Sequence, residues 1–243
     1  MPGECIALGE GVYKRMGNVV VLEDSSFCFS KGMSIVWAPN GSGKTTLVKL
    51  LTGILSPDKG RVALETNSLG VLLEDQALPK SLRVYDLVEF ACHARRVDCR
   101  LEEVERLSGD IGLPQGILGK RLGELSMGTL RKALILQALV GGPETLILDD
   151  PFSSLDPSSR IRLSLLLNRL RDEGTTIIVT THVMSLLEPD SVFTIAGQKV
   201  VGPFPGATRG LVRVIDPENR EIKEVGHEEA LRLYEKGHII IDA

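Results

Sequence analysis

A glycine-rich run, APNGSGKTT, occupies residues 38–46. If this run joins a strand to a helix, its main-chain N–H groups form a concave site for anions, and the positive end of the helix dipole strengthens it. Lys44 adds a mobile positive charge for outer phosphate groups, Thr45 a hydroxyl for Mg²⁺, and Thr46 a hydroxyl for an inner phosphate. An ordinary glycine-rich turn is the alternative, which the Gly-Lys-Thr-Thr order disfavours. The predicted phosphate-binding residues are Asn40, Gly41, Ser42, Gly43, Lys44, Thr45 and Thr46.

The residues around this run alternate between strand and helix patterns. Residues 33–37 predict a buried strand that enters the run, and residues 45–55 predict a helix that leaves it. Because helices separate the later strands, we expect a mostly parallel sheet that is covered on both faces. Residues from 84 onwards are rich in helix formers and predict a helical insertion at about 84–139. The other predicted strands are 19–22, 26–29, 61–64, 69–73, 145–148 and 175–180, and the other helices are 129–140 and 158–172.

Composition limits the class of protein. The 243 residues, 43% of them hydrophobic, can bury a full core and are expected to form one principal domain. The formal net charge of -4 argues against a nucleic-acid partner bound through a basic surface. Because no run of about 20 apolar residues and no signal-peptide pattern is present, we expect any membrane role to come through a partner. The cysteines show no paired spacing, so we expect reduced, mostly buried thiols in a cytosolic protein at Cys5, Cys28, Cys92 and Cys99.

Four motifs follow one another in order: the glycine-rich run at 38–46, LSMGT at 125–129, LILDD at 146–150 and a histidine at 182. In this order they resemble the nucleotide-binding domain of the ATP-binding-cassette (ABC) family. The resemblance implies an α/β P-loop NTPase (RecA-like) fold, with a mostly parallel sheet core, an N-terminal antiparallel β subdomain and an inserted helical subdomain. It also implies ATP and Mg²⁺ as ligands.

The carboxylate pair Asp149 and Asp150 ends an apolar run that resembles the Walker B segment of this family. Asp149 would orient the Mg²⁺ shell. The next position in the family is usually a glutamate that polarises the attacking water, and Asp150 is shorter by one methylene. Because a base must lie about 2.6–3.2 Å from the atom whose proton it takes, we expect a Mg²⁺-dependent ATP hydrolase that turns over slowly. A solvated carboxylate run at the end of a strand is the alternative.

The segment LSMGT stands where the family has LSGGQ, just before a predicted helix. In the family this motif reaches across a head-to-tail dimer, so Ser126 and Gly128 would contact the γ-phosphate held by the other subunit. Met127 replaces a glycine, and Thr129 replaces a glutamine. The alternative is a capped helix start, with Ser126 as the N-cap residue.

Further positions carry over from the resemblance. His182 matches the switch histidine, which would contact the γ-phosphate, and Asp156 matches the D-loop aspartate at the subunit interface. Glu74 stands in place of the Q-loop glutamine, with Gln76 as the alternative. The resemblance thus implies catalytic roles for Asp150, His182 and Lys44, and metal binding by Thr45, Asp149 and Glu74.

The base of the nucleotide has a less typical partner. Met16 stands at the position where the family has an aromatic residue that stacks on adenine. A thioether can pack against a ring face over a smaller area. Tyr13 is the alternative.

Residues 206–243 predict a small C-terminal α+β extension to a domain of residues 1–205. The extension contains a predicted hairpin of 211–215 and 220–225, a helix at 227–236 and a strand at 238–241. An edge extension of the core is favoured over a regulatory or dimerising module. His227 and His238 do not have a metal-binding spacing.

Two functions are compatible with these motifs. The first is the ATP-binding subunit of an ABC transporter, at the cytoplasmic face of the membrane, which dimerises with a second nucleotide-binding domain in a homodimer or heterodimer and powers separate membrane-spanning subunits. The second is a soluble ABC-type ATPase that acts as a slow ATP-operated clamp in assembly or regulation. Apolar residues near the Q-loop predict a docking groove for a membrane partner and favour the first: Leu78, Pro79, Leu82 and Val84.

Overall fold

A six-stranded sheet forms the centre of the molecule. The computed structural model describes residues 4–182, 187–205, 211–215, 222–226, 229, 232, 233, 236 and 239–242. The strand order is β5-β6-β7-β3-β8-β9. The first five strands in this order are parallel to one another, and β9 is antiparallel to β8. The predicted mostly parallel sheet is therefore confirmed. Its strands are β3 (Met33–Trp37), β5 (Leu69–Leu72), β6 (Thr145–Asp149), β7 (Thr176–Thr181), β8 (Ser191–Ala196) and β9 (Lys199–Pro205).

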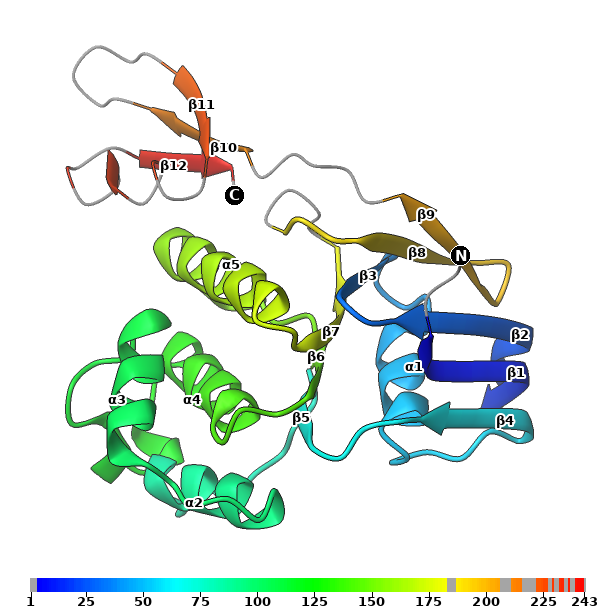
Figure 1. Ribbon diagram of the computed structural model, residues 1–243, viewed down its shortest axis with the longest axis horizontal. Coiled ribbons are helices and arrows are strands. Elements are labelled where there is room, and N and C mark those ends of the chain that lie inside the picture. Colours follow the sequence, from blue (N-terminus) through cyan, green and yellow to red (C-terminus); the bar gives the residue numbers. More distant parts are fainter. Residues whose placement is uncertain are drawn as a thin grey trace.

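Both faces of this sheet are covered. The helices α4 (Met127–Leu139) and α5 (Pro157–Asp172) lie on one face, and α1 (Lys44–Leu51) lies on the other (Figure 1). Every residue of β6 and β7 is buried, as expected for strands packed on two sides. Along β6 the side chains alternate between two apolar clusters: Leu146 and Leu148 join one, and Ile147 joins the other.

The predicted N-terminal antiparallel sheet is present. Its order is β2-β1-β4, with β1 (Cys5–Met16), β2 (Val19–Ser30) and β4 (Lys59–Leu64). Sequence patterns missed β1 and divided β2 into two strands. Gly9 and Gly11 interrupt the apolar alternation of β1, and a Cβ atom at Gly9 would overlap the ring of Phe27, which fills that space instead.

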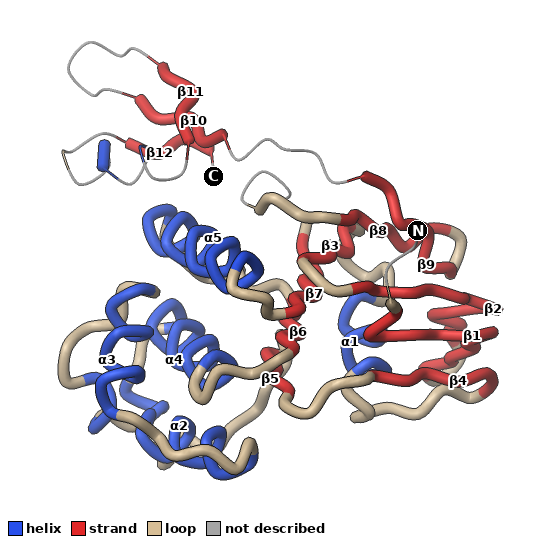
Figure 2. The backbone as a smooth tube through the Cα atoms, viewed as in Figure 1, coloured by secondary structure: helices blue, strands red, loops and turns tan. Residues whose placement is uncertain are grey.

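Helices occupy the predicted insertion. They are α2 (Val84–Ala94), α3 (Leu101–Asp110) and α4, joined by the short turns η1 (Ile117–Gly119) and η2 (Leu122–Glu124). Figure 2 shows that these helices and α5 lie on one side of the central sheet, whereas the N-terminal sheet lies on the other side with α1 between them. The insertion therefore leaves the glycine-rich loop open at the edge of the sheet.

The expectation of reduced thiols is wrong for this structure. Cys5 is bonded to Cys28, with their Cα atoms 5.4 Å apart, and Cys92 is bonded to Cys99, with their Cα atoms 5.6 Å apart. The first bond depends on the pairing of β1 with β2, and the second on the turn that follows α2. The spacing of the four cysteines along the sequence does not indicate either of these pairings.

Three strands form a separate antiparallel sheet near the C-terminus. Their order is β11-β10-β12, with β10 (Leu211–Ile215), β11 (Ile222–Gly226) and β12 (Ile239–Asp242). The predicted hairpin and closing strand are therefore confirmed. Of the predicted helix at 227–236, residues 229, 232 and 233 are helical, and residues including His227 and His238 lie outside the described ranges. The division into residues 1–205 and 206–243 stays a prediction, although Val225 belongs to the larger apolar cluster.

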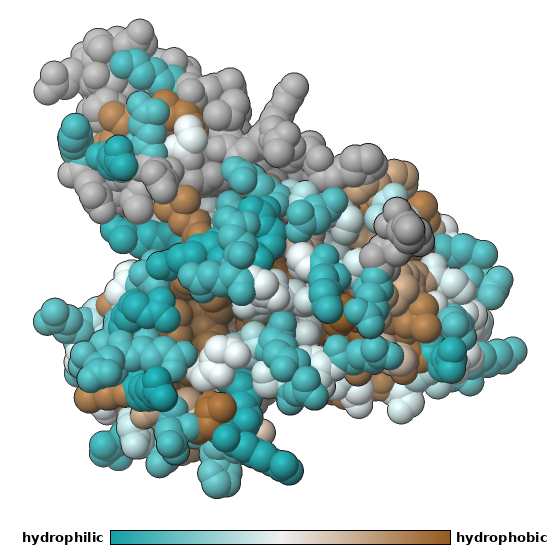
Figure 3. Space-filling model, viewed as in Figure 1, coloured by the Kyte–Doolittle hydropathy of each residue, from teal (hydrophilic) through white to brown (hydrophobic). Residues whose placement is uncertain are grey.

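Among the helices of the described ranges, none combines the length and the apolar character needed to cross a bilayer. Figure 3 shows hydrophilic side chains over most of the face in view, with hydrophobic ones in small groups. Small apolar groups are normal on the surface of a folded domain.

Candidate functional site at the edge of the parallel sheet

The glycine-rich loop connects β3 to α1. Gly41 has a φ of 78° and Gly43 a φ of 105°, a backbone conformation that residues with a side chain rarely adopt. A Cβ atom at Gly43 would also lie 2.5 Å from Cγ1 of Val21. The generic loop has a third glycine where this chain has Ala38. Ala38 is not among the described non-glycine residues with positive φ, so the alanine adds no backbone strain.

Lys44 lies against the inner side of this loop. The residue is 7% exposed, and its Nζ atom donates hydrogen bonds to the main-chain oxygens of Ala38 (2.7 Å) and Pro39 (2.9 Å). These bonds satisfy the buried ammonium group, which is costly to bury unpaired. Its charge therefore adds to the positive end of the α1 dipole.

A cavity of about 610 Å³ opens beside the loop. Its volume is in the range of pockets that hold small molecules and cofactors. Met16, Val19 and Val21 form an apolar side, and Met16 is 45% exposed. Tyr13 is not among the lining residues, and its ring packs instead below Nζ of Lys59 at 5.5 Å. The other lining residues are Asn40, Gly41, Gly43, Lys44, Thr45, Thr46 and Glu74, so Ser42 alone of the predicted loop residues does not line the cavity.

Two side-chain oxygens meet at the edge of this cavity. Oγ1 of Thr45 lies 3.5 Å from Oε2 of Glu74, which is exposed. Gln76, the alternative to Glu74, does not line the cavity, and its Oε1 atom is buried without a partner. Glu74 is therefore the residue of this pair that a ligand in the cavity can reach.

Asp149 ends β6 and does not line the cavity. The side chain is fully buried, and its Oδ1 atom accepts a hydrogen bond from the hydroxyl of Thr180, whereas Oδ2 has no partner. A buried carboxylate oxygen without a donor suits a cation or a water held by one. Within the described residues, no three His, Cys, Asp or Glu side chains come together as a metal site.

Two of the three predicted catalytic side chains, Asp150 and His182, contact each other. Nδ1 of His182 lies 3.3 Å from Oδ2 of Asp150, and the Asp150 side chain is 8% exposed while that of His182 is 50% exposed. Oδ1 of Asp150 is buried without a partner. The carboxylate is therefore held on one oxygen, and the other has no hydrogen-bond partner.

The LSMGT segment begins α4 but does not line the cavity. Oγ of Ser126 accepts a hydrogen bond from the main-chain N–H of Thr129 at 3.2 Å, so Ser126 is the N-cap residue. The side chain of Met127 projects into solvent and is 77% exposed. A Cβ atom at Gly128 would lie 2.9 Å from the main-chain oxygen of Ser154, so glycine allows the two segments to approach closely. Within one chain, Ser126 and Gly128 at the start of α4 therefore lie apart from the cavity that the glycine-rich loop lines.

Asp156 is the N-cap residue of α5. Its carboxylate accepts hydrogen bonds from the main-chain N–H of Ser159 (2.9 Å) and from the hydroxyls of Ser158 and Ser159 (both 2.6 Å). Desolvation raises the pKa of Asp156, but these hydrogen bonds and the charge of Lys132 outweigh it and hold the pKa well below its usual value. The carboxylate therefore stabilises the start of α5 in its ionised form.

Sequence reasoning missed three residues that support this site. Thr180 binds the Asp149 carboxylate, Trp37 donates its Nε1–H to the main-chain oxygen of His182 at 3.1 Å, and Arg131 donates to the main-chain oxygens of Asp149 and Asp150. Thr180 is the penultimate residue of β7, and Trp37 is the last residue of β3. Because β7 lies between β6 and β3, the strand order could have indicated that both residues lie near the site. Nothing in the local sequence indicates where Arg131 points.

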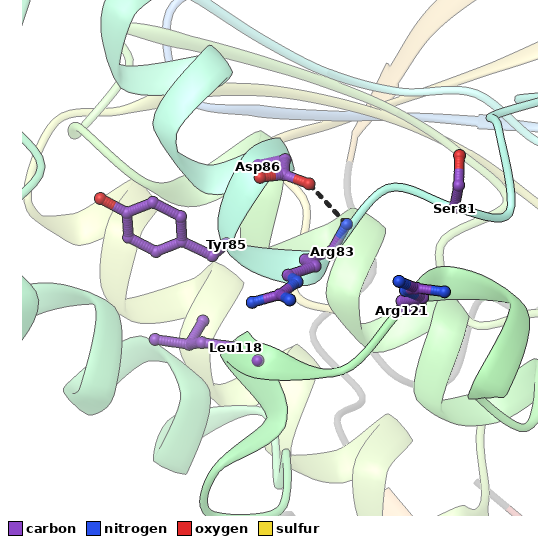
Figure 4. Close-up of a pocket in the computed structure, with 7 residues that line it drawn as sticks. Ser81, Arg83, Tyr85, Asp86, Leu118 and Arg121 are labelled. Carbon is purple, nitrogen blue, oxygen red and sulfur yellow. Dashed lines mark hydrogen bonds between the residues drawn. The ribbon is translucent and has the colours of Figure 1, made fainter.

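Of the residues predicted to form an apolar docking groove, Pro79 alone is exposed, and the prediction is wrong for Val84. Val84 is fully buried, and Leu78 and Leu82 pack against the larger apolar cluster. The groove at this place, of about 410 Å³, is instead mainly polar, and Figure 4 shows side chains that reach it from two segments. Its lining residues are Ser81, Arg83, Tyr85, Asp86, Leu118, Gly119 and Arg121.

Backbone pairing brings the two guanidinium groups to this groove. Arg83 and Arg121 form an isolated antiparallel β-bridge, supported by hydrogen bonds from Val84 N to Lys120 O (3.0 Å) and from Leu122 N to Leu82 O (2.8 Å). Asp86 accepts a hydrogen bond from the main-chain N–H of Arg83 at 2.7 Å, which begins α2 (Figure 4). Both arginine side chains are left exposed.

Comparison with known families matches the part of the chain that carries these residues. Residues 22–153 match the family model described as ABC transporter, and residues 120–188 match a second model described as an AAA domain. The first match covers more than half of the chain.

Curated relatives and solved structures agree with this match. The chain is 31% identical over 189 residues to the Fe(3+) ions import ATP-binding protein FbpC of Mesorhizobium japonicum, which covers 71% of this chain and 52% of that protein. It is 30% identical over 191 residues to the Nod factor export ATP-binding protein I of Rhizobium sp. (strain N33), which covers 73% of this chain and 63% of that protein. The chain thus spans less than two thirds of the length of both relatives. A dimeric structure of a bacterial ABC transporter cassette has the same fold, with a TM-score of 0.73 and 18% identity over 82% of this chain and 98% of that chain.

Proposed function

This chain belongs to the ABC transporter family, and from that premise we propose that it is the ATP-binding and ATP-hydrolysing subunit of an ABC transporter. One observation carries the proposal: the glycine-rich loop, Asp149 and the Asp150–His182 pair follow β3, β6 and β7, which are parallel neighbours. The carboxyl ends of parallel strands meet at one edge of a sheet, where ligands of such folds bind.

The residues of the cavity support ATP as the ligand. The N–H groups of residues 41–45 and the ammonium of Lys44 suit the phosphates, with Thr46 at the inner one. Met16, Val19 and Val21 offer an apolar surface to the base. Since none of these three is aromatic, the base is held by packing without stacking.

Asp150 and His182 suit the hydrolysis step. A water oxygen forms a bond to the γ-phosphorus, the bond to the β-phosphate oxygen breaks, and the water loses a proton. The free Oδ1 of Asp150 suits the water and its proton, and His182, in contact with the other oxygen, suits the γ-phosphate. Because aspartate is one methylene shorter than glutamate, we propose slow turnover.

The donor set at this edge fits Mg²⁺. Thr45 and Glu74 present two adjacent oxygens, and Asp149 presents a buried oxygen without a partner. Mg²⁺ keeps several waters and takes its remaining ligands from one or two carboxylates and from phosphate, so it needs no site made by three protein carboxylates. When bound, it would neutralise charge that develops on the phosphate oxygens.

A second nucleotide-binding domain completes the site. Ser126 and Gly128 lie at the N-terminus of α4, away from the cavity of their own chain, so they are available to a nucleotide bound by another subunit. We propose a head-to-tail dimer, either with a second copy or with a different cassette. The exposed Met127 would lie at this interface and hinder its closure.

The membrane subunit is proposed to dock on the polar groove between Arg83 and Arg121. Two exposed guanidinium groups suit a partner segment that carries carboxylates. We propose that the chain is a peripheral subunit at the cytoplasmic face of the membrane. The transported solute would be selected by that partner, since the curated relatives named above include both an import and an export protein.

Affinity purification tests the transport role. The tagged chain is isolated from detergent-solubilised native membranes, and the bound proteins are identified by mass spectrometry. We expect a membrane protein with several spans in stoichiometric amount, and we expect its loss with Arg83→Glu and Arg121→Glu combined. The matched control reverses two exposed charges elsewhere, Arg61→Glu and Lys199→Glu. Recovery of soluble proteins only would favour the ATP-operated clamp instead.

A further inference from the structure

Arg131, near the start of α4, joins three segments through one guanidinium group. The residue is 7% exposed. Its Nη2 atom donates to the main-chain oxygens of Asp149 (2.6 Å) and Asp150 (2.7 Å), and its Nη1 atom donates to that of Leu73 (3.1 Å). These oxygens follow β6 and β5, where the residues of the candidate site begin. The proposed function assigns no role to this side chain.

The charge of Arg131 lies among carboxylates without binding them. Burial lowers the pKa of the guanidinium, and the negative charges of Asp150, Asp149 and Glu74 oppose that shift, so the group keeps its proton. Its hydrogen bonds go to carbonyl oxygens, while Oδ2 of Asp149 and Oδ1 of Asp150 have no partner. The arginine thus balances the charge of the site and leaves these two carboxylate oxygens without a hydrogen-bond partner.

Asp150 is held in an unusual backbone conformation. Its φ is 43°, in the left-handed region that non-glycine residues rarely adopt. Its N–H donates to the main-chain oxygen of Thr180 at 2.9 Å, and its own main-chain oxygen accepts from Arg131. Hydrogen bonds on both sides of the residue therefore fix the direction of its carboxylate.

We propose that Arg131 is a positioning residue for ATP hydrolysis, which holds the main chain of Asp149 and Asp150 so that the Asp150 carboxylate faces His182 and the nucleotide. This role rests on the proposed function of Asp150. The planar guanidinium reaches the three carbonyl oxygens in fixed directions, whereas the ammonium of a lysine is a single point on a flexible chain. Arg131→Lys therefore keeps the charge and removes the fixed geometry.

Arg95 provides a matched control. Its guanidinium also donates only to main-chain oxygens, those of Leu69 (3.2 Å), Gln137 (3.2 Å), Ala138 (3.0 Å) and Val140 (2.9 Å). It joins β5 and α4 as Arg131 does, but at the opposite end of each. Arg95→Lys thus measures the structural cost of losing such a group away from the site.

The experiment compares Arg131→Lys and Arg95→Lys with the wild type in the full chain. Melting temperature, kcat and KM for Mg²⁺-ATP, and the Kd of a non-hydrolysable ATP analogue are measured, the last by emission of Trp37. We expect both variants to have a lower melting temperature than the wild type. We expect kcat to fall about tenfold or more in Arg131→Lys alone, while its KM and Kd stay within about threefold of the wild-type values. Equal effects of the two variants on kcat, or a loss of Arg131→Lys confined to nucleotide affinity, would overturn the role. If Arg131→Lys does not fold, Arg131→Gln is measured with the same criteria.

A second readout does not need turnover. Because Trp37 donates to the main-chain oxygen of His182, its emission without nucleotide reports on that end of the site. We expect a changed emission maximum in Arg131→Lys and none in Arg95→Lys. A wild-type chain that fails to hydrolyse Mg²⁺-ATP would overturn the proposed function, and unchanged Trp37 emission in Arg131→Lys would overturn the positioning role separately.

Discussion

The Nδ1 atom of His182 lies 3.3 Å from Oδ2 of Asp150, although the two residues are 32 positions apart in the sequence. The contact arises because β6 and β7 are parallel neighbours, so the residues that follow them meet at one edge. The glycine-rich loop follows β3, the next strand beyond β7. One edge of the sheet thus collects the glycine-rich loop and a carboxylate–histidine pair.

Removal of the Lys44 ammonium should abolish nucleotide binding. Lys44→Ala removes the charge that lies at the cavity, and we expect the Kd for ATP to rise about 100-fold or more, because a charge-assisted contact to phosphate is lost. Emission of Trp37, the only tryptophan, measures the Kd. Lys49→Ala is the control, since Lys49 is on the same helix but pairs with Asp75 at 2.6 Å. Unaltered affinity in Lys44→Ala would remove the basis of the phosphate-loop assignment.

The exposed side chain of Met127 should limit dimer formation. In an Asp150→Asn background, which slows hydrolysis, Met127→Gly is expected to raise the dimer fraction at a given ATP concentration, because a side chain that is 77% exposed at the proposed interface is removed. Size-exclusion chromatography with light scattering measures this fraction. Phe90→Ala removes a comparably exposed side chain on α2 and should change nothing. A dimer fraction that falls or stays the same in Met127→Gly would contradict this account of the interface.

Both disulfides should be detectable in solution. Thiol titration of the denatured chain is expected to find no free thiol before reduction and four after it, one for each cysteine. Each cross-link restricts the unfolded chain and contributes about 2–4 kcal/mol, so reduction should lower the melting temperature. The combined variant Cys5→Ser and Cys28→Ser isolates the bond between β1 and β2. Four titratable thiols in protein purified without reductant would contradict the pairing.

The ionised carboxylate of Asp156 should make stability depend on acid pH. The pKa of Asp156 is held well below its usual value in the folded state, so its contribution is complete above the unfolded pKa, about 3.9, and is lost as pH falls towards the folded pKa. Asp156→Asn keeps a good N-cap residue and removes the titration. We therefore expect the difference in unfolding free energy between wild type and variant to be constant from about pH 7 to 5 and to shrink below about pH 4. A difference that does not change over this range would refute the argument.

The sequence was sufficient to predict those parts of the site whose residues are neighbours in the chain. The loop at 38–46 and the carboxylates after β6 are specified by neighbouring residues, and strand and helix patterns placed β3, β6, β7, α4 and α5 within a few residues of their observed ends. The mostly parallel character of the sheet also follows from strands that alternate with helices. Lys44 and Thr45 are neighbours in the loop, and the resemblance to the ABC family implied that Glu74 lies near them, as the 3.5 Å distance between Thr45 and Glu74 bears out.

Contacts between segments that are distant in the chain could not be predicted from sequence patterns. The bond between Cys5 and Cys28 requires the register of β1, a strand whose glycines hide its pattern. The groove between Arg83 and Arg121 requires a bridge between two loops, which turns Val84 inward. Arg131 looks like an exposed helical residue until the helix is packed against β6. Each of these depends on packing that no short window of sequence contains.

Phosphate release from Mg²⁺-ATP by the wild type and by Asp150→Glu tests the central claim most directly. The account predicts slow hydrolysis by the wild type that stops when EDTA removes Mg²⁺, and an increase of about threefold or more with the longer carboxylate, because it reaches the attacking water more closely. Asp150→Asn should be slower than both. Hydrolysis by Asp150→Glu at or below the wild-type rate would contradict the assignment of Asp150 as the residue that activates water.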